Sequence, residues 1–105
     1  MLTKTNVVDL VTQNESTGIY QVVLIIEDNE WSLPNVRSLL QEKANTYLNY
    51  VLDGQMRSDY PDSDRAGVEM IIHFGSPPPA EVSGFVDRLL AAINSEGVHA
   101  SVVPF

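Results

Sequence analysis

The chain has 105 residues, 14 acidic side chains against 6 basic ones, a formal net charge of −8 at pH 7 and no cysteine. This length predicts one domain over residues 1–105, which should bury roughly 65% of the surface that the unfolded chain exposes. The missing cysteines exclude disulfides and thiolate metal sites. The acidic balance argues against nucleic acid or an anionic membrane as the main partner, because both require a cationic surface.

No segment is expected to enter a membrane. Residues 22–26 form an apolar run about a quarter as long as the ~20 residues that a spanning helix needs. Residues 2–6 are mostly polar, and no apolar stretch of signal-peptide length follows them, so a cleaved leader is not expected. Together with the absence of cysteine, this pattern predicts a cytoplasmic protein.

Two strands joined by a hairpin are predicted at the start of the chain, over residues 7–12 and 19–27. The residues between them are polar and end in Gly18, which can take the positive φ that such a turn requires. The second strand is apolar on both faces and is therefore expected in the middle of a sheet. Its two faces carry Tyr20, Val22, Leu24 and Ile26, and Ile19, Val23 and Ile25.

A first helix is predicted after these strands, with Ser32 as its N-cap and Pro34 in its first turn, where a missing N–H costs nothing. Gly54 is expected to end it. One side of this helix is apolar at helical spacing. The stripe consists of Val36, Leu39, Leu40, Ala44, Tyr47, Leu48, Val51 and Leu52.

The second half of the chain repeats the strand and helix pattern. Residues 53–67 are polar and predict a long loop, and residues 68–74 alternate as a half-buried strand does. Prolines 77–79 introduce a second helix that is expected to end at Gly97, before a last strand over residues 98–103. The apolar stripe of this helix consists of Val82, Phe85, Val86, Leu89, Leu90 and Ile93.

The element order β-β-α-β-α-β predicts an α+β fold, a two-layer sandwich with a four-stranded mixed sheet and two helices on one face. Right-handed crossovers make the last three strands parallel, while the first is antiparallel. Reversing the second crossover would instead put one helix on each face, and periodicity alone does not choose. With both helices on one face, the other would expose an apolar strip suited to a homodimer. That predicted dimer face is Val23, Ile25, Ile71 and Val103.

Short motifs carry a likeness to a known family: Val8-Asp9-Leu10-Val11, Thr17-Gly18, Leu40-Gln41-Glu42-Lys43 with Asn45, Tyr47 and Leu48, Gly54-Gln55, and Tyr60-Pro61. With them the sequence resembles a family of small uncharacterised bacterial single-domain proteins. The resemblance covers about the first two thirds of the chain in matched residues. It implies a compact α+β domain and no particular catalytic residue.

A binding site is predicted beyond the carboxyl ends of the parallel strands, where open sheets bind their ligands. That edge should gather Glu27, Asp28, Glu30, Trp31 and His73. Carboxylates beside an aromatic ring could bind a cation, or a basic patch on a partner protein. The alternative interpretation is an acidic loop that only caps the sheet and starts a helix.

No metal, cofactor or catalytic residue is expected. Asp59, Asp62 and Asp64 do not have the spacing of an EF-hand. The two histidines, His73 and His99, could approach each other only if the last two strands are neighbours, and strand histidines are more often ordinary surface residues. The sequence also lacks a nucleophile elbow and a phosphate-binding loop.

Binding is therefore favoured over chemistry. The acidic excess suggests a small protein-binding module, of inhibitor or immunity type, that recognises a basic protein. The alternative is a small-ligand binder or small enzyme that uses the edge formed by residues 27–31 and His73. A homodimer that packs its uncovered sheet faces together is a third hypothesis.

Overall fold

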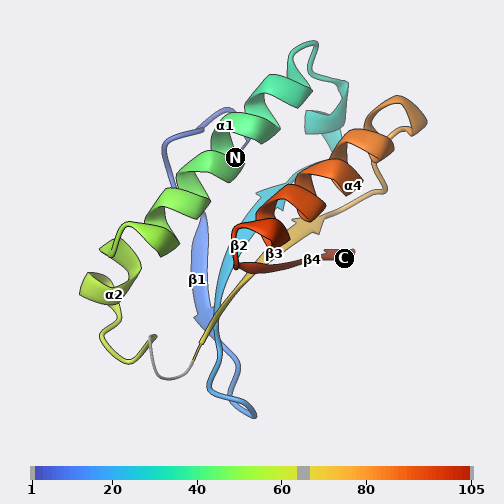
Figure 1. The fold of residues 1–105 in the computed structure, drawn as a ribbon. Helices are drawn as coiled ribbons and strands as arrows, with labels where there is room; N and C mark the ends of the chain where they lie inside the picture. The colour runs from blue at the N-terminus through green and yellow to red at the C-terminus, as the bar shows by residue number, and fades with distance from the viewer. Residues whose placement is uncertain (1, 64–66, 105) are drawn as a thin grey trace.

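A computed structural model describes residues 2–63 and 67–104, and they form a four-stranded sheet with its helices on one side (Figure 1). The sheet order is β1-β2-β3-β4, with β1 antiparallel to β2 and the other pairs parallel. The predicted α+β fold is confirmed. The elements are β1 (Leu10–Gln13), β2 (Tyr20–Ile26), the 3-10 helix η1 (Asp28–Ser32), α1 (Val36–Leu52), α2 (Gln55–Asp59), β3 (Val68–Phe74), α4 (Ala80–Ser95) and β4 (His99–Pro104).

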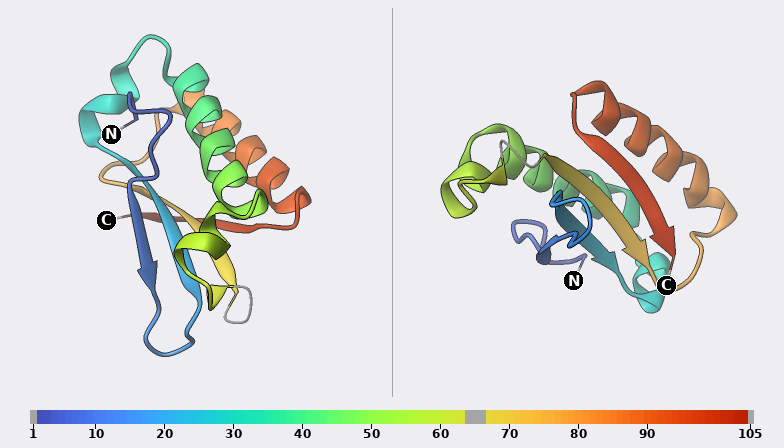
Figure 2. Two further views of the ribbon diagram at one scale, coloured as in Figure 1. Left: turned by 90° about the vertical axis from the view of Figure 1, so that its left-hand side faces the viewer. Right: turned by 90° about the horizontal axis from the view of Figure 1, so that it is seen from below.

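Both long helices cover the same face of the sheet. The two crossovers, from β2 to β3 and from β3 to β4, step in the same direction across the sheet. Crossovers of one hand that step the same way leave their helices on the same side. Figure 2 shows this arrangement, with α1 and α4 side by side on one side of the strands. The arrangement with one helix on each face is therefore excluded.

The hydrophobic core fills the space between the helices and the sheet. Alternate residues of each strand point into it, because successive side chains of a strand leave opposite faces. The stripes predicted for the two helices supply the other wall. Core residues that are at most 1% exposed include Val22, Leu24, Ile26, Met70 and Ile72 from the strands, Leu40, Ala44 and Tyr47 from α1, and Ile93 from α4.

Strand β1 begins three residues later than predicted. The sequence places its start at residue 7, whereas pairing with β2 begins at Leu10, opposite Val23. At the residue before Leu10, the Asp9 carboxylate accepts a hydrogen bond from the Ile25 backbone N–H at 3.0 Å. A side chain thus takes the place of a strand partner, so the apolar residues before it do not extend β1.

The start of α1 also differs from the prediction. Ser32 is not its N-cap, since residues 28–32 form η1 and the helix starts after Asn35. The physical reason is the pair of acidic residues around η1. Glu27 and Glu30 form a reciprocal capping box, in which each side chain accepts a hydrogen bond from the other's backbone. This motif starts a separate turn upstream of α1.

The predicted loop over residues 53–67 contains the short helix α2. Gly54 does end α1, with a φ of 95°, but the chain turns directly into α2. Met56 of α2 is 1% exposed and joins the core. Leu52, which the stripe of α1 was expected to bury, is 52% exposed because it lies at the last residue of the helix. Asp64 lies outside the described residues.

Candidate functional site

The side of the sheet turned away from the helices carries an apolar surface, which we call the open face. Its members follow from alternation and register: Val23 on β2 is opposite Ile71 on β3, and Ile25 is aligned with His73 and Val103. Leu10 of β1 is aligned with Val23 and joins them. The four predicted dimer-face residues, Val23, Ile25, Ile71 and Val103, therefore share one face.

The open face is a shallow apolar floor between two projecting side chains. Val23 and Ile71, in the central strands, are 7% and 9% exposed. Leu10 and Val103, in the outer strands, are 44% and 42% exposed. No helix or strand of the described chain lies over this side (Figure 2). What is available to a partner is therefore mainly Leu10 and Val103, with half-buried Ile25 between them.

One end of the open face is polar. The Thr12 hydroxyl donates to the Gln21 side chain at 3.1 Å, and the Gln21 amide donates to Glu69 at 2.7 Å. His99 is aligned with Glu69 on the next strand. These four residues form a row across all four strands, and the hydrogen bonds hold the side chains of Thr12, Gln21 and Glu69 in place. Among the described strand side chains on this face, Glu69 is the one carboxylate.

At the carboxyl edge of the sheet, Glu27 and Asp28 are exposed but Glu30 is not. The Glu30 carboxylate is 7% exposed and accepts hydrogen bonds from the backbone N–H groups of Leu2, at 2.6 Å, and Glu27, at 2.9 Å. Burial alone would raise the pKa of Glu30, but hydrogen bonds and positive charge that favour the carboxylate, these two donors among them, lower the pKa overall. Glu30 therefore anchors the chain and presents no charge to a ligand.

The structure separates His73 from Trp31. The Trp31 indole N–H donates to the Ser76 carbonyl at 2.9 Å, and its ring packs edge-on against Phe74 at 6.0 Å between centroids. Phe74 belongs to the core on the helix side, whereas its neighbour His73 points to the open face. The five residues predicted as one binding edge, Glu27, Asp28, Glu30, Trp31 and His73, thus lie on two sides of the sheet.

The two histidines share the open face without meeting. His99 is aligned with Glu69 and His73 with Val103, four residues further along the strand. Four residues of a strand span about 13 Å. Within the described residues there is no group of three His, Asp or Glu side chains that could hold a metal ion.

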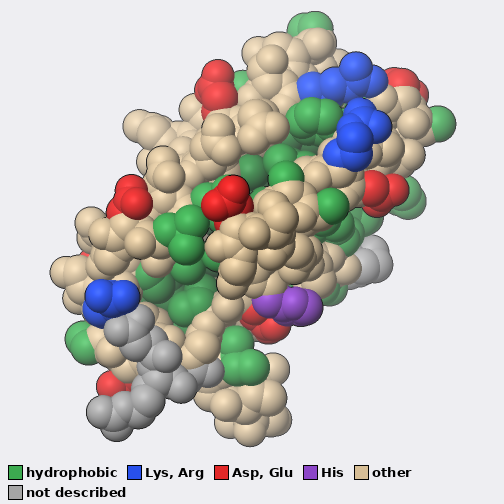
Figure 3. Space-filling model, viewed as in Figure 1, with side chains coloured by type: hydrophobic (Ala, Val, Ile, Leu, Met, Phe, Trp, Pro, Cys, Tyr) green, Lys and Arg blue, Asp and Glu red, His purple; other side chains and the backbone are tan. Residues whose placement is uncertain are grey.

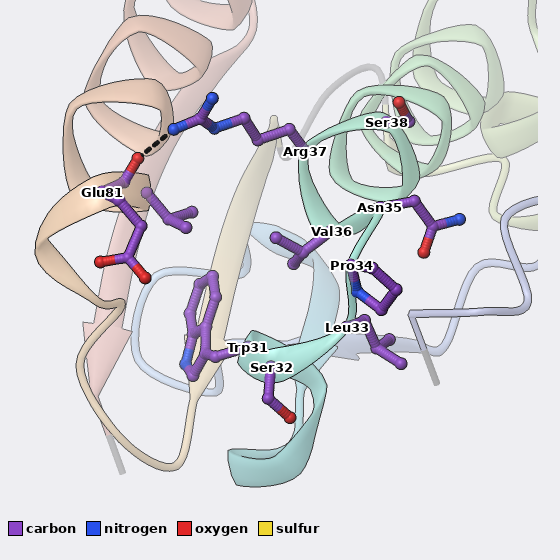
Figure 4. Close-up of a pocket in the computed structure, with 10 residues that line it drawn as sticks. Trp31, Ser32, Leu33, Pro34, Asn35, Val36, Arg37, Ser38 and Glu81 are labelled. Carbon is purple, nitrogen blue, oxygen red and sulfur yellow. Dashed lines mark hydrogen bonds between the residues drawn. The ribbon is translucent and has the colours of Figure 1, made fainter.

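A cavity of about 350 Å³ lies beside Trp31, between the chain that leads into α1 and the first turn of α4 (Figure 4). It is lined by Trp31, Ser32, Leu33, Pro34, Asn35, Val36, Arg37, Ser38, Glu81 and Val82. Trp31 was predicted to belong to a site, but the other residues were not. They come from two segments more than 40 residues apart, which periodicity does not bring together.

A buried polar network was also missed. Lys43 and Asp9 form an ion pair at 2.7 Å, and both side chains are 0% exposed. The Tyr47 hydroxyl accepts from the Asp9 N–H and donates to the Val23 carbonyl, both at 2.7 Å. A signal was present, because Lys43 falls within the apolar stripe of α1 and Asp9 lies inside an apolar run. Three residues of the family motifs quoted above, Asp9, Lys43 and Tyr47, thus meet in the core.

The fold and these sites define a two-layer α+β protein with one sheet face uncovered and a small cavity at the carboxyl edge. The chain belongs to a family of unknown function, DUF6572, whose profile matches residues 1–104. No curated protein and no solved structure matches it. Across the residues that the structure describes, none of the helices has the length and apolar character needed to cross a membrane.

Proposed function

We propose that the protein is a non-catalytic binding module that uses its open face to hold another protein. The observation that carries this proposal is the one-sided sheet, with helices over one face and an apolar strip on the other. Water in contact with apolar side chains is unfavourable, at roughly 25 cal/mol per Å². A partner that covers Leu10, Ile25 and Val103 would remove that cost.

The charge around the open face supports a basic partner. Glu27 and Asp28 are exposed just beyond one end of β2, and Glu15 is exposed in the hairpin at the other end. Among the described strand side chains, the face itself holds a single carboxylate, Glu69. An apolar centre with a charged rim is the usual composition of a transient interface. Acidic groups at the rim would speed encounter with a basic protein, as for inhibitors and immunity proteins.

The second candidate partner is another copy of the chain. Four strands about 4.8 Å apart and three rows of residues about 6.6 Å apart give a flat area of about 400 Å². A stable interface needs about 800 Å² from each partner. A homodimer packed face to face would therefore be weak, although a face with few charged groups would limit repulsion between two copies that each carry −8. A basic partner that also covers the acidic rim reaches the larger area.

Affinity capture from the native lysate tests the proposal, with Val103→Asp as the disrupting variant. Its matched control is Leu52→Asp, since Leu52 is exposed to a similar degree but lies at the end of α1. We expect a basic protein to be captured by the wild type and by Leu52→Asp and lost with Val103→Asp. Equal capture by all three would show that the open face is not part of the interface.

We also propose a cytoplasmic location, which cell fractionation tests.

A further inference from the structure

A second hollow adjoins the cavity beside Trp31, and the two meet at Arg37. The second hollow measures about 340 Å³ and lies in the groove between α1 and α4. It is lined by Arg37, Ser38, Gln41, Glu42 and Phe85, so Arg37 and Ser38 border both spaces. Arg37 thus stands at the middle of a continuous depression on the helix side, on the face opposite to the open face.

The charge of Arg37 is not neutralised by a carboxylate. Its guanidinium donates a hydrogen bond to the backbone carbonyl of Glu81. Between residues that the structure describes, the one ion pair is that of Lys43 with Asp9. Figure 4 shows the Glu81 carboxylate turned away from the guanidinium, toward the side of the cavity where Trp31 lies. Among the described residues, the Arg37 guanidinium therefore pairs with a backbone carbonyl and with no carboxylate.

Arg88 carries a second guanidinium on α4, near this depression but not among the residues that line either hollow. One of its terminal nitrogens lies 3.6 Å from where a Cβ atom would stand on Gly84, so the side chain runs back along α4. Gly84 is three residues from Glu81, or about 4.5 Å along the helix axis, so the two guanidiniums lie over neighbouring turns. Figure 3 shows basic side chains together over the N-terminal halves of α1 and α4. Their positive charges lie on the same side of the molecule and together favour an anion there.

Apolar side chains form part of the cavity lining, beside a larger polar part. Trp31, Val36 and Val82 are almost buried in its wall, and Leu33 is half-buried beside them. A ligand held by Arg37 could therefore place a small uncharged part against these side chains. The cavity lies beyond the carboxyl ends of β2 and β3, where open sheets commonly bind small molecules.

We propose that this depression binds a small molecule with an oxyanion group next to an apolar part. The oxyanion, a phosphate or a carboxylate, accepts hydrogen bonds from Arg37, whose planar fork fits either group, and Arg88 adds positive charge nearby. The apolar part lies against Trp31 and Val36. Glu81 opposes the ligand weakly, since its carboxylate borders the same cavity.

Nuclear magnetic resonance titration tests the proposal through the indole N–H of Trp31, the single tryptophan of the chain. The probes are phenyl phosphate, benzoate and phenyltrimethylammonium, at up to about 10 mM, because contacts of this kind give affinities near the millimolar range. We expect one or both oxyanions to shift the resonance and the cation not to shift it. The two oxyanions distinguish phosphate from carboxylate. No shift with either of them, or an equal shift with the cation, would overturn the proposal.

Charge variants separate direct contact from the general field of the protein. Arg37→Gln should weaken binding about tenfold, the effect of one lost charged hydrogen bond, and Arg88→Gln should weaken it less because its charge acts from outside the hollows. Arg57→Gln makes the same charge change on α2 and should leave binding unchanged. Glu81→Gln should strengthen it. If Arg57→Gln weakened binding as much as Arg37→Gln, the site would not be at Arg37. Val103→Asp should still bind the probes, which keeps this site distinct from the open face.

Discussion

The Lys43 ammonium lies 2.7 Å from the Asp9 carboxylate, and neither side chain is reached by solvent. Every polar atom around them has a partner: Lys43 also donates to the Lys4 carbonyl at 3.0 Å, and Asp9 accepts from the Ile25 N–H. A buried ion pair whose remaining groups are satisfied ties down the chain that forms it. Here it holds residues 2–9 between α1 and β2.

Removal of one member of this pair should destabilise the fold strongly. Lys43→Met leaves the Asp9 charge buried without a counter-ion, which costs about 3–5 kcal/mol. Urea unfolding followed by circular dichroism measures the change. Lys4→Met is the control, since Lys4 is exposed, and should change stability by less than about 0.5 kcal/mol. A loss below about 1 kcal/mol for Lys43→Met would show that the pair is not buried.

The Tyr47 hydroxyl should contribute separately. Tyr47→Phe leaves the Asp9 N–H and the Val23 carbonyl without a partner, and we expect a loss of about 1–3 kcal/mol. Burial also raises the pKa of Tyr47 well above its ordinary value. Because the folded pKa exceeds the unfolded one, this contribution is complete below about pH 10 and is lost as pH rises further. Stability measured from pH 8 to 11 should therefore fall more steeply in the wild type than in Tyr47→Phe.

A second tyrosine gives a pH test that requires no unfolding. Burial first, and then the hydrogen bond of 2.9 Å to Asp59, raise the pKa of Tyr50 to about 12. Asp59→Asn removes the carboxylate charge, so the pKa of Tyr50 should move down toward 10. An ultraviolet titration of phenolate formation in both proteins measures this shift. An unchanged titration curve would mean that Asp59 does not face Tyr50 in solution.

The Glu30 carboxylate should stabilise the fold at neutral pH and not in acid. Glu30→Gln removes the charge that accepts the Leu2 and Glu27 N–H groups, with an expected loss of about 1.5–3 kcal/mol. The pKa of Glu30 is lowered by folding, so its contribution is present above about pH 4.5 and is lost as pH falls through the folded value. The wild type and the variant should therefore approach each other in stability as the pH falls below about 4.5. A difference that stays constant from pH 7 down to the acid unfolding of the protein would refute the assigned role.

The outer edge of β4 is closed by a side chain. The Asn94 amide accepts from the Ala100 N–H at 3.1 Å and donates to the Ala100 carbonyl at 3.2 Å, as a neighbouring strand would. Pro104 ends the strand without an N–H to offer. Asn94→Ala should therefore expose this edge and increase self-association, which sedimentation velocity detects. If the variant stays as monodisperse as the wild type, Asn94 is not needed to protect the edge.

The sequence predicts a helix or strand well where the residues of that one segment are enough to determine its structure. Strand β3 was located to the residue, because its alternating pattern lies between Gly67 and Gly75. The start of α1 was misplaced because Glu27 and Glu30 cap each other, a pairing that competes with the Ser32 signal. Such competition between nearby caps depends on small free energies that spacing does not reveal.

Contacts between distant segments were harder to predict. Lys43 and Asp9 each looked unusual in an apolar setting, but nothing in one sequence links positions 34 residues apart. The site at Arg37 depends on the direction of the second crossover, which brings α4 beside α1. The open face was predicted as one of two alternatives, and the same crossover decided between them.

Alkylation rates of single introduced thiols test the central claim, that the open face binds a protein. The chain has no cysteine, so Val103→Cys and Leu52→Cys each carry one thiol on an exposed position. Each variant is labelled in dilute pure form, in concentrated pure form and in native lysate. We predict that lysate slows alkylation at position 103 at least severalfold and leaves the rate at position 52 unchanged. If copies of the chain pair weakly, alkylation at position 103 should also be slowed, to a smaller degree, in concentrated pure protein. Equal rates at position 103 in all three conditions would contradict the account.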